Sequence, residues 1–146
     1  FNLWQQTAYD LPLRVFGKSP GLSEPARDVD HLREIYQQSK IFYNTSIHSP
    51  VPTVMLEAMA CGCAIVSTST CMIPEIIKHG ENGLISNDPQ ELRSFLELLL
   101  ANKDLAKKLG QNARKTIEEK YNLKRFTDDW NTLFYKTIED YSDLQE

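Results

Sequence analysis

The sequence predicts an α/β domain, a parallel sheet with helices on both faces, followed by a helical C-terminal extension. Short apolar runs alternate with segments whose apolar residues recur every three or four positions, as strands and amphipathic helices do. Beyond residue 88 only the helical spacing remains, over 89–101, 103–119 and 123–141. Strands that alternate with helices form parallel sheets with right-handed crossovers, and such sheets bind ligands at the carboxyl ends of their strands.

The first part of the chain is expected to contain two helices and two strands. Helical spacing covers residues 1–9 and 28–39. The apolar run Leu11–Phe16, stopped by Gly17, predicts a first strand, and Ile41–Asn44 predicts a second. A loop rich in Gly, Pro and Ser lies between them.

The middle of the chain predicts a helix followed by a buried strand. Thr53 is a good N-cap for a helix over 54–61, and Gly62 is well placed to end it. Ala64–Ser67 follows as an apolar third strand, which is typical of a sheet covered on both faces.

The next segment predicts a short helix, a turn and a last strand. Pro74 suits a first helical turn, and His79-Gly80 would close that helix. Asn82-Gly83 predicts a turn before a strand at Leu84–Ile85. Asp88–Glu91 has the pattern of a capping box, which indicates a helix start.

Composition excludes several classes of protein. The 146 residues are enough for one domain, and the net charge of −4 with a pI near 5.4 argues against a nucleic-acid binder. No apolar run approaches the roughly 20 residues of a membrane span, and residues 1–15 lack the order of a signal peptide. The three cysteines, which lie in apolar surroundings, fit reduced thiols in a cytoplasmic protein better than disulfides or a metal site.

The helix expected at 54–61 is apolar on every side except at Glu57. A helix that is apolar all round is predicted to be buried, and a buried carboxylate is rarely left unpaired. Two kinds of partner are possible for its carboxylate. Glu57 either meets an Arg, a Lys or backbone amides near the helix start, or accepts hydrogen bonds from ligand hydroxyls. A ribose diol fits because one carboxylate can accept from both hydroxyls.

The start of the same helix predicts an anion site. The amides of Thr53, Val54 and Met55 would have no partner in the helix, and the helix dipole favours negative charge there. Pro52 would stiffen the loop before them. One helix could therefore hold a diphosphate at its tip and a ribose one turn further in, which would be a nucleotide site without a glycine-rich loop.

Several spaced motifs resemble one enzyme family. The stretch SPVPTVMLEAMACGCAIVST at 49–68, then IPEII at 73–77 and HGENGL at 79–84, resembles the signature of the group 1 (family 4) glycosyltransferases of the GT-B fold. The resemblance covers roughly residues 11–130. It implies a Rossmann-like domain, the C-terminal half of a two-domain enzyme, whose N-terminal acceptor-binding domain would be absent from residues 1–146.

The resemblance also implies a function and a set of site residues. In that family this domain binds a nucleotide sugar, usually with UDP or GDP, for retaining transfer without a bound metal or other cofactor. It assigns the ribose to Glu57, the sugar and phosphate to the turn Val51–Val54 with Pro52 and Thr53, and the neighbourhood of the sugar to Ser49. No residue of the chain is predicted to be a nucleophile or general base, so residues 1–146 alone are expected to be inactive.

Three features depart from the family pattern. Ser49 stands where the family has a glutamate that contacts the transferred sugar. The family's first strand, with an Arg and a Lys for the diphosphate, would lie upstream of Phe1, and Lys18 could replace part of that charge. The span from Gly17 to Asp28 is too short for the usual extra helix and strand.

Other readings of the sequence stay open. The chain could be a non-catalytic or degenerate nucleotide-binding module, or part of a sugar-nucleotide epimerase or phosphorylase on the same plan. His48 and Glu75 could face a ligand. The aromatic residues Trp4, Trp130, Phe134 and Tyr135 are expected in the core. Residues 103–125 are rich in Lys and Arg, which predicts a solvated helical face or contact with an anionic membrane surface.

Overall fold

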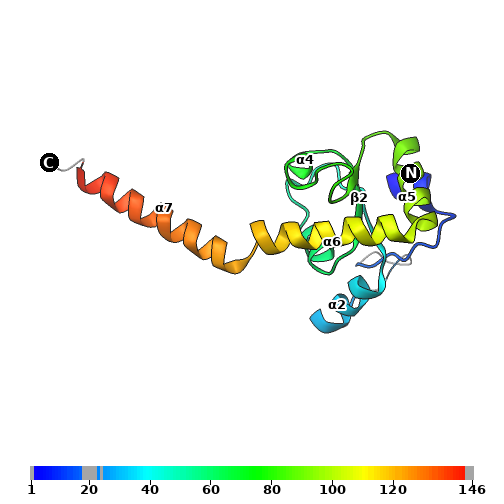
Figure 1. The fold of residues 1–146 in the computed structure, drawn as a ribbon, viewed down its shortest axis with the longest axis horizontal. Coiled ribbons are helices and arrows are strands. Elements are labelled where there is room, and N and C mark those ends of the chain that lie inside the picture. The colour runs from blue at the N-terminus through cyan, green and yellow to red at the C-terminus, as the bar shows by residue number, and fades with distance from the viewer. Residues whose placement is uncertain (1, 18–22, 24, 144–146) are drawn as a thin grey trace.

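The computed structural model describes residues 2–17, 23 and 25–143, and Figure 1 shows their arrangement. A compact α/β body carries one long helix that projects away from it (Figure 1). The helices have the following bounds: α1 Leu3–Ala8, α2 Val29–Gln38, α3 Thr53–Ala60, α4 Ile73–Ile76, α5 Pro89–Ala101, α6 Lys103–Lys120 and α7 Leu123–Asp143.

The sheet of the described chain has three parallel strands in the order β1-β2-β3. These are β1 (Ile41–Asn44), β2 (Ala64–Ser67) and β3 (Leu84–Ile85), as the apolar runs predict. Asn44 is level with Ser67 at the carboxyl ends of β1 and β2, and Ser67 is level with Ile85. The register therefore brings the loops that follow the strands to one edge.

Helices cover both faces of the sheet, which confirms the predicted layers. On one face Ile65 packs in a cluster with Met55 and Met59 of α3. On the other face Ala64 and Val66 pack with α5. Since successive side chains of a strand point to opposite faces, a strand covered on both sides is expected to be almost continuously apolar, and in β2 only Ser67 at the carboxyl end is polar.

The helix α6 approaches the turn between α3 and β2 at close range. A Cβ built on Gly110 would lie 2.1 Å from the carbonyl oxygen of Gly62. Gly62 itself has a φ of +82°, the left-handed conformation that ends α3, as predicted. Two glycines therefore let one helix rest on the backbone of the turn.

The predicted strand at Leu11–Phe16 is wrong. The segment belongs to no strand, and the amide of Leu13 donates to the carbonyl of Leu11 at 2.7 Å, which bends the backbone. Pro12 also lacks the amide that a strand needs for its ladder. The apolar residues of this segment instead line a groove beside β1.

The helix starts differ from the predictions in detail. Pro52, not Thr53, is the N-cap of α3, and Thr53 is the first helical residue, so the helix has no side-chain cap. Asp88 does cap α5 by accepting from the amides of Gln90 and Glu91. The carboxylate of Glu91 accepts instead from the hydroxyl of Ser86, at 2.5 Å, so half of the predicted capping box forms.

The short helix α4 ends at Ile76, before the predicted close at His79-Gly80. Asn82 is buried and does more than form a turn. Its side-chain amide donates to the carbonyl of Ile76 and to the hydroxyl of Thr116, which ties the segment to α6.

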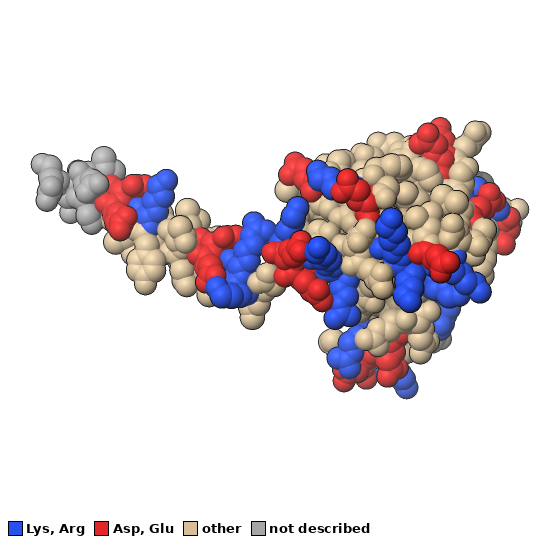
Figure 2. Space-filling model, in the orientation of Figure 1, with Lys and Arg blue, Asp and Glu red and all other residues tan. Residues whose placement is uncertain are grey.

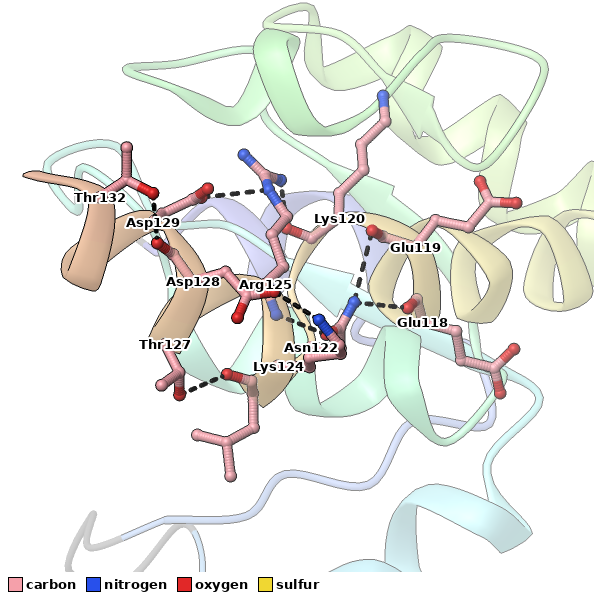
Figure 3. A network of polar contacts seen from close by, with 11 residues as sticks. Glu118, Glu119, Lys120, Asn122, Lys124, Arg125, Thr127, Asp128, Asp129 and Thr132 are labelled. Carbon is pink, nitrogen blue, oxygen red and sulfur yellow. Dashed lines mark hydrogen bonds and ion pairs between the residues drawn. The ribbon is translucent and has the colours of Figure 1, made fainter.

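A cluster of polar contacts joins α6 to α7 (Figure 3). The side-chain amide of Asn122 donates to the carbonyl of Glu118 at 2.9 Å, and its oxygen accepts from the amide of Arg125. The guanidinium of Arg125 also donates to the carbonyl of Lys120. One asparagine therefore caps the end of α6 and the start of α7, and this orients the projecting helix.

The prediction that the aromatic residues of the last helix lie in the core is wrong. Trp130 is 44% exposed, Phe134 56% and Tyr135 69%, whereas Trp4 of α1 is half-buried.

Charges of both signs cover α6 and α7 in Figure 2. Among the described helices, none combines the length and apolar character that crossing a bilayer requires.

Candidate functional site

Polar side chains link the strand ends at the edge where the sequence predicts a site. The buried amide of Asn44 donates to the hydroxyl of Ser67 at 2.8 Å, and Ser67 donates to the carbonyl of Thr68. Asn87, after β3, exchanges two hydrogen bonds with the backbone of Ser69. These hydrogen bonds thus link the carboxyl ends of all three described strands along one edge of the sheet.

The loop after β1 is held against the loop after β2. The hydroxyls of Thr68 and Thr70 both donate to the carbonyl of Ser46, at 2.5 and 3.0 Å. The amide of Met72 donates to the carbonyl of Pro50 at 3.2 Å. These bonds fix the path of the chain into α3, and a fixed path is what a preorganised binding turn requires.

The N-terminus of α3 opens at this edge with free donors. Met55 donates its amide to the carbonyl of Pro52, but within the described residues the amides of Thr53 and Val54 donate to no protein acceptor. Both residues are exposed, while Pro52 is buried behind them. Unpartnered amides and the positive end of a helix dipole together attract an anion.

Glu57 lies one turn into α3 and, contrary to the prediction, is exposed. The buried face of α3 carries Met55, Ala58 and Met59, and Glu57 lies off that face. The carboxylate meets neither the predicted cation nor the helix-start amides among the described contacts: its Oε2 accepts from the hydroxyl of Tyr36, at 3.1 Å. Glu57 is therefore accessible to a ligand.

The remaining predicted residues surround this helix start. Ser49 is half-buried in the loop before it, and Val51 packs against the core cluster below α3. His48 is exposed in the same loop, and Glu75 is exposed on α4. Lys18 lies outside the described residues.

Two arginines close to α3 lie at its C-terminal end. Arg33 and Arg114 both favour the thiolate of Cys61, but burial outweighs them and raises the pKa of this thiol. Cys61 is the C-cap of α3, so these guanidinium groups lie at the opposite end from the free amides. The amides and the dipole would thus be the main attraction for a phosphate group in this part of the chain.

The groove lined by Leu11–Gly17, α2 and β1 has a volume of about 960 Å³. Its lining is mostly apolar, and from the helix start it includes Val54 but neither Thr53 nor Glu57. A nucleotide needs donors for phosphate and acceptors for ribose, so the polar edge at α3 is the better candidate site.

The three cysteines are free in the structure, and Cys63 is fully buried. Burial raises the pKa of the Cys63 thiol to about 12, which leaves it protonated at neutral pH. Within the described residues, no three His, Cys, Asp or Glu side chains gather in a way that could hold a metal.

The sequence analysis missed Tyr36 and Asn44 as members of the site. The helical spacing of residues 28–39 places Tyr36 on the apolar face of that helix, and Asn44 is the last residue of the apolar run that predicts a strand. Both carried a signal, since a buried phenol hydroxyl or amide needs a partner. The sequence does not say which partner that is.

The comparisons with known proteins agree on a family. Residues 25–116 match the family described as glycosyl transferases group 1. N-acetyl-alpha-D-glucosaminyl L-malate synthase from Bacillus anthracis is 27% identical over 113 residues, which are 76% of this chain and 30% of that enzyme. The chain thus spans less than a third of the length of the curated relatives it matches.

Solved structures share the fold. The C-terminal domain of the group 1 glycosyl transferase LpcC from Francisella tularensis has a TM-score of 0.61 at 26% identity, over 70% of this chain and 55% of that one. HepE from Anabaena, solved in complex with UDP-glucose, has a TM-score of 0.69 at 17% identity, over 80% of this chain and 33% of that one. The parallel sheet with helices on both faces agrees with this fold. Because the family model matches residues 25–116, more than half of the chain, the chain belongs to the group 1 glycosyl transferases, as its motifs indicate.

Proposed function

We propose that this chain is the nucleotide-sugar-binding domain of a glycosyltransferase, with the diphosphate at the amides of Thr53 and Val54 and the ribose at Glu57. One observation carries the proposal: α3 presents free amides and an accessible carboxylate one turn apart, at the edge where the described strands end. Positive and negative partners in this order match a phosphate followed by a sugar diol.

The donor is proposed to be a UDP- or GDP-sugar, transferred with retention of configuration. Support for UDP comes from HepE, which has the same fold and was solved with UDP-glucose. Pro52, Val51 and Ser49 would lie beside the sugar and phosphate. Catalysis would rest on positioning and on stabilisation of the leaving diphosphate by fixed dipoles, with no metal or other cofactor.

The proposal assigns the acceptor to another part of the protein, an N-terminal acceptor-binding domain. The matched relatives are much longer than the matched segment, and the described residues offer no nucleophile or base beside Glu57 that we would assign. Cations for the diphosphate would come from Lys18 or from the rest of the protein. Residues 1–146 alone are therefore expected to bind a nucleotide without transferring a sugar.

A non-catalytic nucleotide-binding module is the second candidate, and Ser49 is the observation that favours it. A serine offers one hydroxyl where the family pattern has a carboxylate for the sugar. This candidate predicts nucleotide binding without transfer even in the full-length protein, so a transfer assay separates the two.

Contact with an anionic membrane, and a cytoplasmic location, stay predictions. The cations of α6 are exposed, but Arg114 and Lys115 pair with Glu118 and Glu119 one turn on, which reduces the net positive charge of the surface. Co-sedimentation with vesicles of phosphatidylglycerol at low and high salt tests the contact.

Titration calorimetry with UDP, GDP and ADP tests the proposal. We expect one of them to bind and Glu57→Ala to weaken it roughly 5- to 150-fold, since a lost charged hydrogen-bond partner costs about 1–3 kcal/mol. Glu139→Ala on the projecting α7 removes the same charge far from the site and should bind as the wild type does (Figure 1). Absence of binding at millimolar nucleotide, or equal affinity after Glu57→Ala, contradicts the proposal.

A further inference from the structure

A hydrogen bond between α2 and α3 reaches the proposed ribose site from the core. The hydroxyl of Tyr36 donates to Oε2 of Glu57 at 3.1 Å, across 21 positions of sequence. Tyr36 is only 8% exposed, whereas Glu57 is exposed. The donor is therefore a buried group and its acceptor a surface carboxylate.

The ring of Tyr36 is held in place by its surroundings. It belongs to the core cluster that contains Met55 and Met59, and it meets the ring of Phe42 edge-on at 6.1 Å between centroids. Burial and the nearby carboxylate raise the pKa of the phenol, so it stays protonated and can donate at neutral pH. A fixed phenol is a preorganised donor.

An exposed glutamate on a helix otherwise samples several rotamers, and fixing it on ligand binding costs free energy. The bond to Tyr36 uses one acceptor position of the carboxylate. A carboxylate has about four such positions, so enough remain for both hydroxyls of a ribose.

We propose that Tyr36 is a positioning residue of the nucleotide site, which holds the carboxylate of Glu57 ready for the ribose hydroxyls. The inference rests on the function proposed above. Tyr36 need not touch the nucleotide; its effect on affinity passes through Glu57. The effect should therefore vanish when the carboxylate is removed and become smaller when one of the two ribose hydroxyls is removed.

The test measures nucleotide affinity after Tyr36→Phe, which keeps the ring and its packing and removes the hydroxyl. The probe is whichever of UDP, GDP and ADP the wild type binds most tightly, together with its 2′-deoxy form. Tyr36→Phe should weaken binding roughly 2- to 10-fold, the loss expected for one hydrogen bond. In a Glu57→Ala background it should cause no further loss, and with the 2′-deoxy nucleotide the loss should be smaller.

Tyr43→Phe is the matched control. Tyr43 is a half-buried tyrosine of β1 whose hydroxyl bonds that of Thr7 at 2.7 Å, in the cluster on the other face of the sheet. Its variant should lose a similar hydrogen bond and keep wild-type affinity. Melting curves of both variants show that each is folded at the titration temperature.

The possible failures are distinct. If no nucleotide binds the wild type, the proposed function is overturned and this inference with it. If binding is weakened by Glu57→Ala but not by Tyr36→Phe, the nucleotide site stands and the positioning role is wrong. The role is also wrong if Tyr36→Phe costs the same affinity in the Glu57→Ala background, because its effect would then not pass through Glu57.

Discussion

The helices α3 and α7 both carry large apolar side chains, but α3 buries them and α7 leaves them exposed. In α3, Met55, Ala58 and Met59 are completely buried between β2 and α6. In α7, Trp130 and Phe134 are large, apolar and spaced four apart, yet each remains about half exposed. Figure 1 shows that α7 leaves the body, whereas α3 packs against β2 and α6.

This difference shows that an apolar helix face predicts that the helix must pack against something. It does not predict which segment of the chain packs there. The cover of α3 comes from residues distant in the sequence, including Ile65 and Ala113. In α7, Trp130 instead meets the rings of Phe126 and Phe134, which belong to the same helix. Stability should therefore depend on α3 and hardly on α7.

The largest effect is expected from Met59→Ala in α3. Removing a fully buried methionine leaves a cavity, which should lower the free energy of unfolding by about 2–5 kcal/mol. Urea denaturation followed by circular dichroism measures it. A loss below about 1 kcal/mol would mean that the core under α3 is not packed as described.

The next largest loss of stability is expected from Gly110→Ala. The added Cβ would collide with the carbonyl of Gly62, and backbone atoms cannot move aside as a flexible side chain can. We expect a loss of about 1–3 kcal/mol in the same urea experiment. Gln111→Ala, at the exposed neighbouring position of α6, serves as the control and should be nearly neutral. Equal stability of the two variants would rule out the close approach of α6 to the turn.

Asn122→Ala should act on the junction of α6 and α7 and leave the core unchanged. It removes the cap shared by α6 and α7, worth about 1 kcal/mol, and frees the amide of Arg125 (Figure 3). Hydrogen–deuterium exchange should quicken over residues 123–129 and stay unchanged in α3. Thr132→Ala, which loses a hydroxyl bond within α7, should leave that exchange as it is. Faster exchange in both helices would show that α7 is coupled to the core.

The smallest effect is expected from Phe134→Ala. An aromatic side chain that stays 56% exposed contributes little to folding, so the change should stay within about 0.5 kcal/mol. Measured beside Met59→Ala, it compares the two helices directly. A loss of 2 kcal/mol or more would mean that another surface covers α7 in solution.

Local rules predicted most elements of the fold and failed where the partner of a segment decided its state. Ala64–Ser67 is a strand with the predicted bounds, since four residues buried on both faces leave little choice. Leu11–Phe16 is also rich in apolar residues but forms no strand, since only Phe16 takes part in a β-bridge and the backbone turns at Leu13. A strand is defined by its neighbour, which composition does not reveal.

The candidate site divides in the same way. The amides of Thr53 and Val54 could be assigned from the sequence, because a helix start always leaves donors unpaired. The exposure of Glu57 could not, since an apolar helix indicated that the residue was buried. Its bond to Tyr36 joins two helices whose relative placement depends on the packing of the whole core.

The sequence by itself determined the order of strands and helices from residue 28 onward, the glycine that ends α3, and the family through its spaced motifs, since all of these depend on local geometry and residue order. Only the tertiary structure decided that Glu57 faces outward with Tyr36 as its donor, that Gly110 rests on Gly62, and that α7 stands apart from the core. These depend on contacts between segments far apart in the chain, which form only when the helices pack on the sheet.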